Sequence, residues 1–166
     1  MIRRITITLA VLAVASLVLA DDHMHAAAAP SPSFDKMKAL VGDWKADVPG
    51  MGTTSASYKL YSDGTALVEE MKTHGDTMVS VYYPTADGVA MTHYCSTHNQ
   101  PHMVAASGAQ NLSFSQVSID NLPSKDAMHM SAVNFAFKDA NHFTATWTNT
   151  NAGKDMVVPF DFVRVK

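Results

Sequence analysis

Short segments in which apolar and polar residues alternate follow one another from residue 43 to the end of the chain. In the segment 142–149, Phe143, Ala145 and Trp147 fall on one face, and histidine and threonine fall on the other. This alternation indicates a strand with one buried face and one solvent-exposed face. Turn-forming residues such as Ser62-Asp63-Gly64 separate the segments. The pattern predicts strands at 43–48, 54–61, 65–71, 77–83, 89–96, 102–107, 111–117, 129–137, 142–149 and 156–165.

A helical period occurs only before these strands. Ser33 can cap a helix that ends near Gly42 and carries four apolar residues at helical spacing, namely Phe34, Met37, Leu40 and Val41. Strands of this spacing are typical of an all-β barrel or a sandwich. We favour the barrel, because a short helix before the first strand would plug one end. The predicted fold is therefore all-β, a ten-stranded antiparallel barrel behind a short N-terminal helix, with Pro159 at an edge or irregular position.

The first twenty residues have the pattern of a secretory signal peptide. Arg3 and Arg4 precede an uncharged apolar run that ends at Ala20. The run is shorter than the roughly 20 residues that a transmembrane helix needs, and its small residues favour cleavage after Ala20. We therefore expect a periplasmic or secreted protein with a signal peptide at 1–20, a flexible leader at 21–33 and a single domain at 34–166.

Charge and cysteine content exclude several classes of partner and anchor. The net charge is −3, and removal of Arg3 and Arg4 makes it more negative. Nucleic acid is therefore not an expected partner, since phosphate binding relies on a basic surface. Cys95 is the single cysteine. It cannot form an internal disulfide, and it does not lie at the cleavage site, where a lipid anchor would need it. We expect a soluble domain without a membrane anchor.

Several stretches resemble known proteins. Residues 34–44, which end in Gly42-Asp43-Trp44, resemble the helix and Gly-x-Trp opening of calycins. A family of uncharacterised bacterial secreted proteins with a lipocalin-like domain of unknown function is similar over about residues 34–165, in Ala66-Leu67-Val68-Glu69-Glu70, Met78-Val79-Ser80-Val81-Tyr82, Thr92-His93-Tyr94-Cys95 and Asn99-Gln100-Pro101-His102-Met103. The resemblance implies a calycin-like barrel. Calycins bind small apolar molecules or haem, and for this chain such a ligand is implied by analogy only.

The hairpin from Met91 to Met103 concentrates the residues that can carry chemistry. Residues two apart on a strand share a face, so Val89, Met91, His93 and Cys95 point together. The two apolar residues predict that this face is the barrel interior, which places His93 and Cys95 in the lumen. Polar residues at core positions tend to mark function. The alternative is a hydrogen-bonded core histidine and a cysteine that acts as a small buried hydrophobe.

The first functional hypothesis is a pocket for a small, mostly apolar molecule. A barrel of eight to ten strands is wide enough to hold one such ligand. Methionines suit an adaptable pocket wall, and equally they can fill gaps in a core. The predicted ligand-binding residues are the walls Trp44, Met91, Phe143 and Trp147, with the polar or sulfur-bearing residues Glu69, His93, Cys95 and Gln100.

The second hypothesis is a transition metal or haem on the same hairpin. Imidazole and thiolate suit copper or zinc, and the hairpin supplies His93, Cys95, His98 and His102. The spacing matches no standard zinc motif. His102 should share a strand face with Val104, so it comes near His93 only if the register of the two strands allows it. Haem would need one axial histidine on an apolar wall, for which His93 is the better candidate.

The third hypothesis is catalysis, and the fourth is a purely structural role. In an enzyme, Cys95 would be the nucleophile and His93 its base, but no oxyanion donor or third orienting residue is visible. Catalysis is therefore not expected. A structural or interaction module would have a filled lumen without free volume.

Cleavage after Ala20 would create a separate metal site. Its new terminus, Asp21-Asp22-His23, offers an α-amine, two amide nitrogens and an imidazole in the tetragonal arrangement that Cu(II) and Ni(II) prefer. The alternative is a leader whose histidines have no role.

Overall fold

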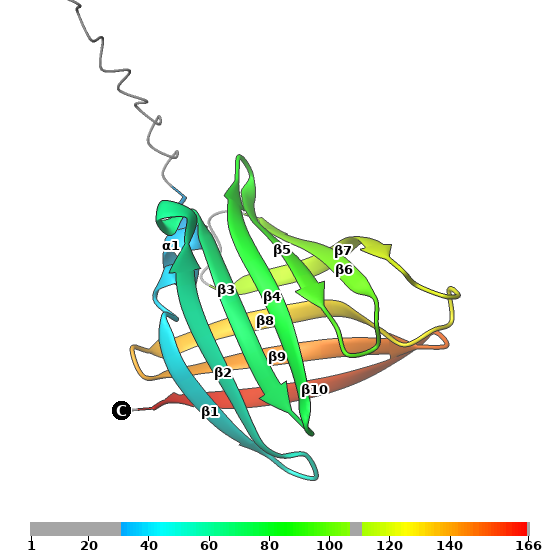
Figure 1. The fold of residues 1–166 in the computed structure, drawn as a ribbon. Coiled ribbons are helices and arrows are strands. Elements are labelled where there is room, and N and C mark those ends of the chain that lie inside the picture. The colour runs from blue at the N-terminus through cyan, green and yellow to red at the C-terminus, as the bar shows by residue number, and fades with distance from the viewer. Residues whose placement is uncertain (1–30, 107–110, 166) are drawn as a thin grey trace, which may run out of the picture.

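A computed structural model of the chain describes residues 31–106 and 111–165. These residues form a closed barrel in which every strand pairs antiparallel with its neighbours in sequence, and the first strand pairs with the last (Figure 1). The elements are α1 (Pro32–Lys38), β1 (Gly42–Val48), β2 (Gly52–Tyr61), the single turn η1 (Ser62–Gly64), β3 (Ala66–Thr73), β4 (Asp76–Thr85), β5 (Gly88–Tyr94), β6 (Gln100–Ala106), β7 (Leu112–Asp120), β8 (His129–Asp139), β9 (His142–Asn151) and β10 (Lys154–Arg164).

The predicted all-β fold, a ten-stranded antiparallel barrel behind a short helix, is confirmed. The bounds of the helix differ from the prediction. Its cap is Ser31, whose hydroxyl accepts a hydrogen bond from the amide of Phe34, and Pro32 occupies the first turn, where its missing N–H costs nothing. The helix thus begins inside the segment 21–33 and ends at Lys38, before the turn that leads to Gly42.

Helix α1 lies at one end of the barrel (Figure 1). Its apolar side chains are buried there. Two side chains fix the turn after it. Trp44 Nε1 donates to the carbonyl of Leu40 at 2.7 Å. The Arg164 guanidinium donates to the carbonyls of Val41 and Ala39 at 2.7 and 2.8 Å and lies 4.1 Å from the Trp44 ring. The first strand, the last strand and the helix are thereby joined at this end.

Aromatic side chains fill the barrel below the helix. Phe143 makes an edge contact with Trp44 at 4.7 Å between ring centroids and stacks on Phe162 at 4.9 Å. Phe135 stacks on Phe143 and meets Phe114 edge-on. These rings are almost completely buried. The helix end is therefore a packed core.

The opposite end is less tightly closed, because two strand pairs are short. β1 and β10 pair only through Trp44–Arg164 and Lys45–Val163, and β7 and β8 pair over residues 112–115 and 132–135. Both ladders lie at the helix end. Beyond them, the sheet β8–β10 separates from the sheet β1–β7. We call this end the mouth of the barrel.

Pro159 lies at an edge, one of the two kinds of position that the sequence predicts. It pairs with Thr146 of β9, whereas the ladder between β10 and β1 does not reach it. The amide of Val165 donates to Asp43 of β1, and every second residue of β10 has its amide on that side. Pro159 therefore faces the unpaired side of β10, where the missing N–H breaks no ladder hydrogen bond.

Candidate functional site

The inward side chains of β3, β4 and β5 form three successive layers from the helix end to the mouth. The deepest layer contains Leu67, Tyr82 and Met91, and the middle layer contains Glu69, Ser80 and His93, as the register of the three strands shows. The layer at the mouth contains Met71 and Met78, which face each other across β3 and β4. The chemistry of the interior thus changes from apolar to polar to sulfur.

The middle layer is a buried hydrogen-bond network. Glu69 is 1% exposed, and its two carboxyl oxygens accept hydrogen bonds of 2.7 Å from the hydroxyls of Tyr58 and Tyr82. Burial raises the pKa of Glu69, although hydrogen bonds from Tyr58, Tyr82 and Ser80 act in the opposite direction. Burial also raises the pKa of both tyrosines well above the usual value. The network satisfies the carboxyl group within the protein.

His93 ends this network. Its Nδ1 and the Ser80 hydroxyl share a hydrogen bond of 2.9 Å. The imidazole tautomer decides which group donates in this bond, since a hydroxyl can donate or accept. Burial lowers the pKa of His93 to about 4. Its ring lies 5.4 Å from the indole of Trp147, and neither His93 Nε2 nor Trp147 Nε1 has a hydrogen-bond partner within the described ranges.

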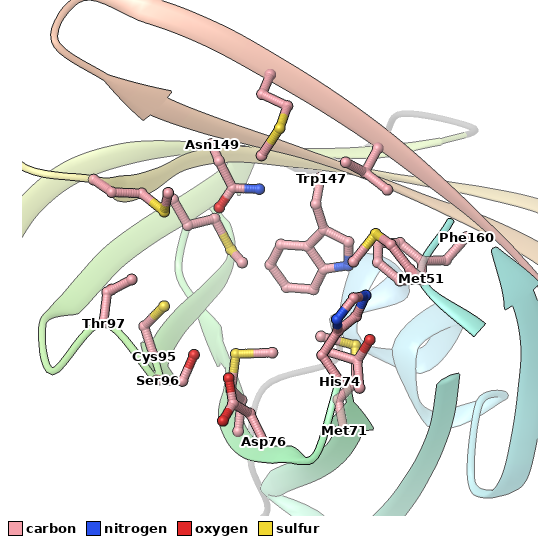
Figure 2. Close-up of a pocket in the computed structure, with 16 residues that line it drawn as sticks. Met51, Met71, His74, Asp76, Cys95, Ser96, Thr97, Trp147, Asn149 and Phe160 are labelled. Atoms are coloured by element: carbon pink, nitrogen blue, oxygen red, sulfur yellow. The ribbon is translucent and has the colours of Figure 1, made fainter. Parts of the chain in front are cut away.

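A cavity of about 240 Å³ lies at the mouth. Figure 2 shows Trp147 in the middle of the surrounding side chains, with Cys95, Ser96 and Thr97 on one side and Met51 and Phe160 on the other. Four of the five connections at this end of the barrel contribute residues to the wall, and the strands β9 and β10 contribute residues near the fifth. The lining consists of Met51, Met71, Thr73, His74, Asp76, Met78, Cys95, Ser96, Thr97, Met128, Met130, Trp147, Asn149, Met156, Val158 and Phe160.

The structure places two of the predicted ligand-binding residues, Cys95 and Trp147, on this cavity. Glu69 and His93 lie in the polar layer and do not line it. Gln100 is half-buried, and its side-chain oxygen accepts a hydrogen bond from the side-chain amide of Asn121. The remaining three predicted wall residues belong to the packed core, namely Trp44, Met91 and Phe143.

The four residues of the metal and haem hypothesis point in different directions. His93 is bonded to Ser80 inside the barrel, whereas His102 bonds Thr92 and Asp120 on the outer face. His98 is exposed in the turn between β5 and β6. Within residues 31–106 and 111–165, no group of three or more His, Cys, Asp or Glu side chains is placed to hold a metal ion. The structure thus gives this hypothesis no support.

The catalytic pairing of Cys95 with His93 has no geometric support either. Neither imidazole nitrogen of His93 bonds the thiol. Nδ1 is hydrogen-bonded to Ser80, and Nε2 has no hydrogen-bond partner in the described part of the chain. Cys95 lies after the end of β5, on the cavity wall. No hydrogen bond among the described residues therefore links the thiol to a base in His93.

Six methionines of the lining are absent from the site residues that the sequence predicts: Met51, Met71, Met78, Met128, Met130 and Met156. The sequence does contain a signal for these methionines, in the order of the connections between strands. In a barrel of antiparallel neighbours, every second connection returns to the same end. Each of these methionines lies in or close to one of the connections at the mouth. Their clustering can therefore be deduced once strand order is assumed.

Two predictions concern segments before the described part of the chain. The signal peptide and the amino-terminal copper or nickel motif of Asp21, Asp22 and His23 lie outside residues 31–106 and 111–165. In the described ranges, no helix combines the length and the apolar character that crossing a bilayer requires.

The barrel is similar to a solved structure of a protein of unknown function from the DUF3598 family of Nostoc punctiforme. The two share 11% sequence identity, with a TM-score of 0.55 over 78% of this chain. The chain spans about half, 48%, of the length of that structure. No protein-family model and no curated protein matches the sequence. The comparison therefore supports the fold.

Cys95 is free, as expected, but it is only partly buried, which corrects the expectation of a thiol inside the lumen. The strand ends one residue before it, so the thiol lies at the open end of the barrel. We expect a neutral disulfide reagent to label Cys95 in the folded protein on the order of tenfold more slowly than after unfolding. Absorbance of the released thiol measures both rates. Equal rates would place the thiol on the open surface, and no native labelling would place it in the core.

Proposed function

We propose that this protein binds a small, neutral, mostly apolar molecule in the cavity at the mouth of the barrel. The cavity itself carries the proposal, because most of its surface is apolar and comes from methionine, aromatic and valine side chains. Ligand sites in proteins commonly have this composition. Methionine adds an adaptable surface that accommodates different apolar shapes. A purely structural module would have no need of such free volume.

The size and charge of the cavity limit its ligand. A volume of about 240 Å³ lies below the range of roughly 300–1,000 Å³ typical of small-molecule sites. The lining drawn from the described residues contains Asp76 and His74 but no lysine or arginine. An anionic head group would therefore lack a cationic partner and would lose its hydration. These features favour a neutral ligand no larger than a bicyclic ring system.

The two short strand pairs supply a route into the cavity. Among the described residues, no backbone ladder joins β1 to β10 on the mouth side of Lys45, and none joins β7 to β8 on the mouth side of Ser115. Met128 and Met156 of the lining are 41% and 54% exposed, so apolar surface extends to solvent. A ligand can enter there without unfolding a paired strand.

Export and a relation to lipocalin-like proteins belong to the same proposal. The support for export is the apolar run after Arg3 and Arg4. The support for the relation is the ten-stranded barrel behind a short helix together with Gly42-Asp43-Trp44. A soluble exported barrel would carry its ligand between membranes or outside the cell.

The test is a ligand titration with two matched variants. Val158 lines the cavity, whereas its neighbour Val157 is 57% exposed on the outer face. We expect Val158→Asp to weaken the binding of naphthalene at least about tenfold, because a carboxylate near an apolar ligand must be desolvated. Val157→Asp should bind like the parent. Quenching of tryptophan fluorescence follows the titration.

Native mass spectrometry of protein recovered from its host complements the titration. We expect a mass that begins at Asp21 and a retained neutral molecule that organic solvent removes. The proposal of ligand binding fails if the parent binds neither naphthalene nor any host molecule, or if the two aspartate variants bind alike.

A further inference from the structure

Two buried nitrogen atoms of neighbouring rings, Trp147 Nε1 and His93 Nε2, lack a hydrogen-bond partner among residues 31–106 and 111–165. Both side chains are 1% exposed, and their ring centroids are 5.4 Å apart. Buried polar atoms in folded proteins are nearly always hydrogen-bonded, so an unbonded pair in adjacent rings requires an explanation. A ligand group that bonds both nitrogens would provide one.

The pair lies at the floor of the cavity. Trp147 lines the cavity, and Figure 2 shows its indole ring in the middle of the surrounding side chains. Met78 also lines it, and Ser80 is the next inward residue of β4 and faces His93. His93 therefore lies one layer deeper than the cavity wall. A ligand whose apolar part fills the cavity would bring only its inner end to the two nitrogens.

We propose that the ligand of this cavity is a neutral alcohol or phenol whose hydroxyl group bonds Trp147 Nε1 and His93 Nε2. This inference rests on the proposed binding of an apolar molecule and adds the polar group by which that molecule is recognised. The indole N–H can only donate, so it bonds the hydroxyl oxygen. A hydroxyl suits His93 in either tautomer, because it donates to a bare Nε2 and accepts from a protonated Nε2. A carbonyl or ether oxygen would suit only the protonated form.

The distance between the rings and the charge of the pair fit a hydroxyl group. Hydrogen bonds between nitrogen and oxygen are about 2.9 Å long, so two nitrogens that share one oxygen lie within about 6 Å of each other. Rings with centroids 5.4 Å apart can meet this limit. Burial lowers the pKa of His93 to about 4, so the imidazole is uncharged near pH 7. An uncharged pair offers no counter-ion to a carboxylate, whose burial would be costly.

The experiment compares 2-naphthol with naphthalene, which has the same rings without the hydroxyl. We expect the folded parent to bind 2-naphthol at least about tenfold more tightly, because each neutral hydrogen bond strengthens binding several-fold. In a cavity without polar partners the order would be reversed, since the hydroxyl would lose its hydrogen bonds to water. Isothermal titration calorimetry measures both affinities and does not depend on tryptophan fluorescence.

His93→Phe and Trp147→Phe should each remove most of this preference. The readout is the ratio of the two affinities, so a general loss of binding cancels. Tyr94→Phe is the matched control, because Tyr94 is the neighbour of His93 on β5 and is 50% exposed on the outer face. This variant also loses a polar group but should keep the ratio of the parent.

A second measurement uses the parent protein alone. Trp44 and Trp147 are its two tryptophans, and Trp44 Nε1 already donates to the carbonyl of Leu40. In a nitrogen–proton NMR spectrum, 2-naphthol should move the indole proton of Trp147 to higher frequency as the hydrogen bond forms. Naphthalene offers no oxygen and should not, and the indole signal of Trp44 should change in neither complex.

The inference is overturned if 2-naphthol binds no more tightly than naphthalene, if His93→Phe keeps the preference, or if Thr97→Val removes it instead. Thr97 is the competing position for the ligand hydroxyl, because it lines the cavity and its own hydroxyl oxygen lacks a partner among the described residues. Any of these results with naphthalene still bound would leave the apolar site of the proposed function in place. Binding of neither compound would contradict both.

Discussion

Replacement of Trp147 by alanine is expected to lower the free energy of unfolding by about 3–5 kcal/mol. The indole is 1% exposed and contacts the rings of Phe135 and His93 at centroid distances of 6.4 and 5.4 Å. Its truncation would extend the cavity at the mouth deep into the barrel. Unfolding in urea, followed by far-UV circular dichroism, measures the loss.

Trp147→Phe is the matched control for this prediction. Phenylalanine keeps most of the buried ring and removes the indole nitrogen, which has no hydrogen-bond partner among the described residues. The loss of stability should therefore be at most about half that of the alanine variant. If Trp147→Ala costs less than about 1 kcal/mol, the indole is not part of the packed core and the cavity floor lies elsewhere.

The barrel itself could be predicted because its local signals agree. The alternation of Phe143, Ala145 and Trp147 with threonines sets one face of β9, and Gly-containing turns separate the strands. The start of the helix is harder to predict, since both Ser31 and Ser33 precede apolar residues. Pro32 decides between them, because a proline fits the first helical turn and Ser31 then becomes the cap.

The position of the site could not be derived from side-chain direction alone. Strand parity places His93 and Trp44 in the interior, and both are buried there. It does not say how far along the barrel axis each side chain lies. Trp44 is near the helix and is bonded to Leu40, whereas Met71 lies at the mouth. The position of a residue along the barrel axis depends on whether the nearest connection between strands lies at the helix end or at the mouth. That follows from the order in which the strands are connected.

The polar layer explains why Glu69 and His93 are inside without being part of the cavity. A buried carboxyl group requires hydrogen-bond donors, and Tyr58 and Tyr82 supply them from the strands on either side. Ser80 faces Glu69 on β3 and His93 on β5, and its hydroxyl shares a hydrogen bond with His93. The layer thus lies beneath Met71 and Met78, and the hydrogen bonds of Glu69 give these strands a defined register.

Acidification from pH 7 to pH 4 is expected to reduce the contribution of His93 to stability by about 3 kcal/mol. The pKa of His93 is about 4 in the folded protein because burial disfavours the imidazolium, against an ordinary value of 6.5. Above pH 6.5, the side chain is neutral in both states. Between pH 6.5 and pH 4, the unfolded chain binds a proton that the folded protein does not, so stability falls as the pH falls.

The comparison of the parent with His93→Gln isolates this contribution. Glutamine can still bond Ser80 but does not titrate, so its unfolding free energy should fall by about 3 kcal/mol less than that of the parent over the same pH range. The raised pKa of Glu69 acts in the opposite direction, because the folded protein takes up that proton first on acidification. Glu69 is present in both proteins, and its effect therefore cancels in the difference. Urea unfolding at pH 7, 6, 5 and 4 provides the data, and parallel curves for the two proteins would show that the imidazole is accessible to protons in the folded state.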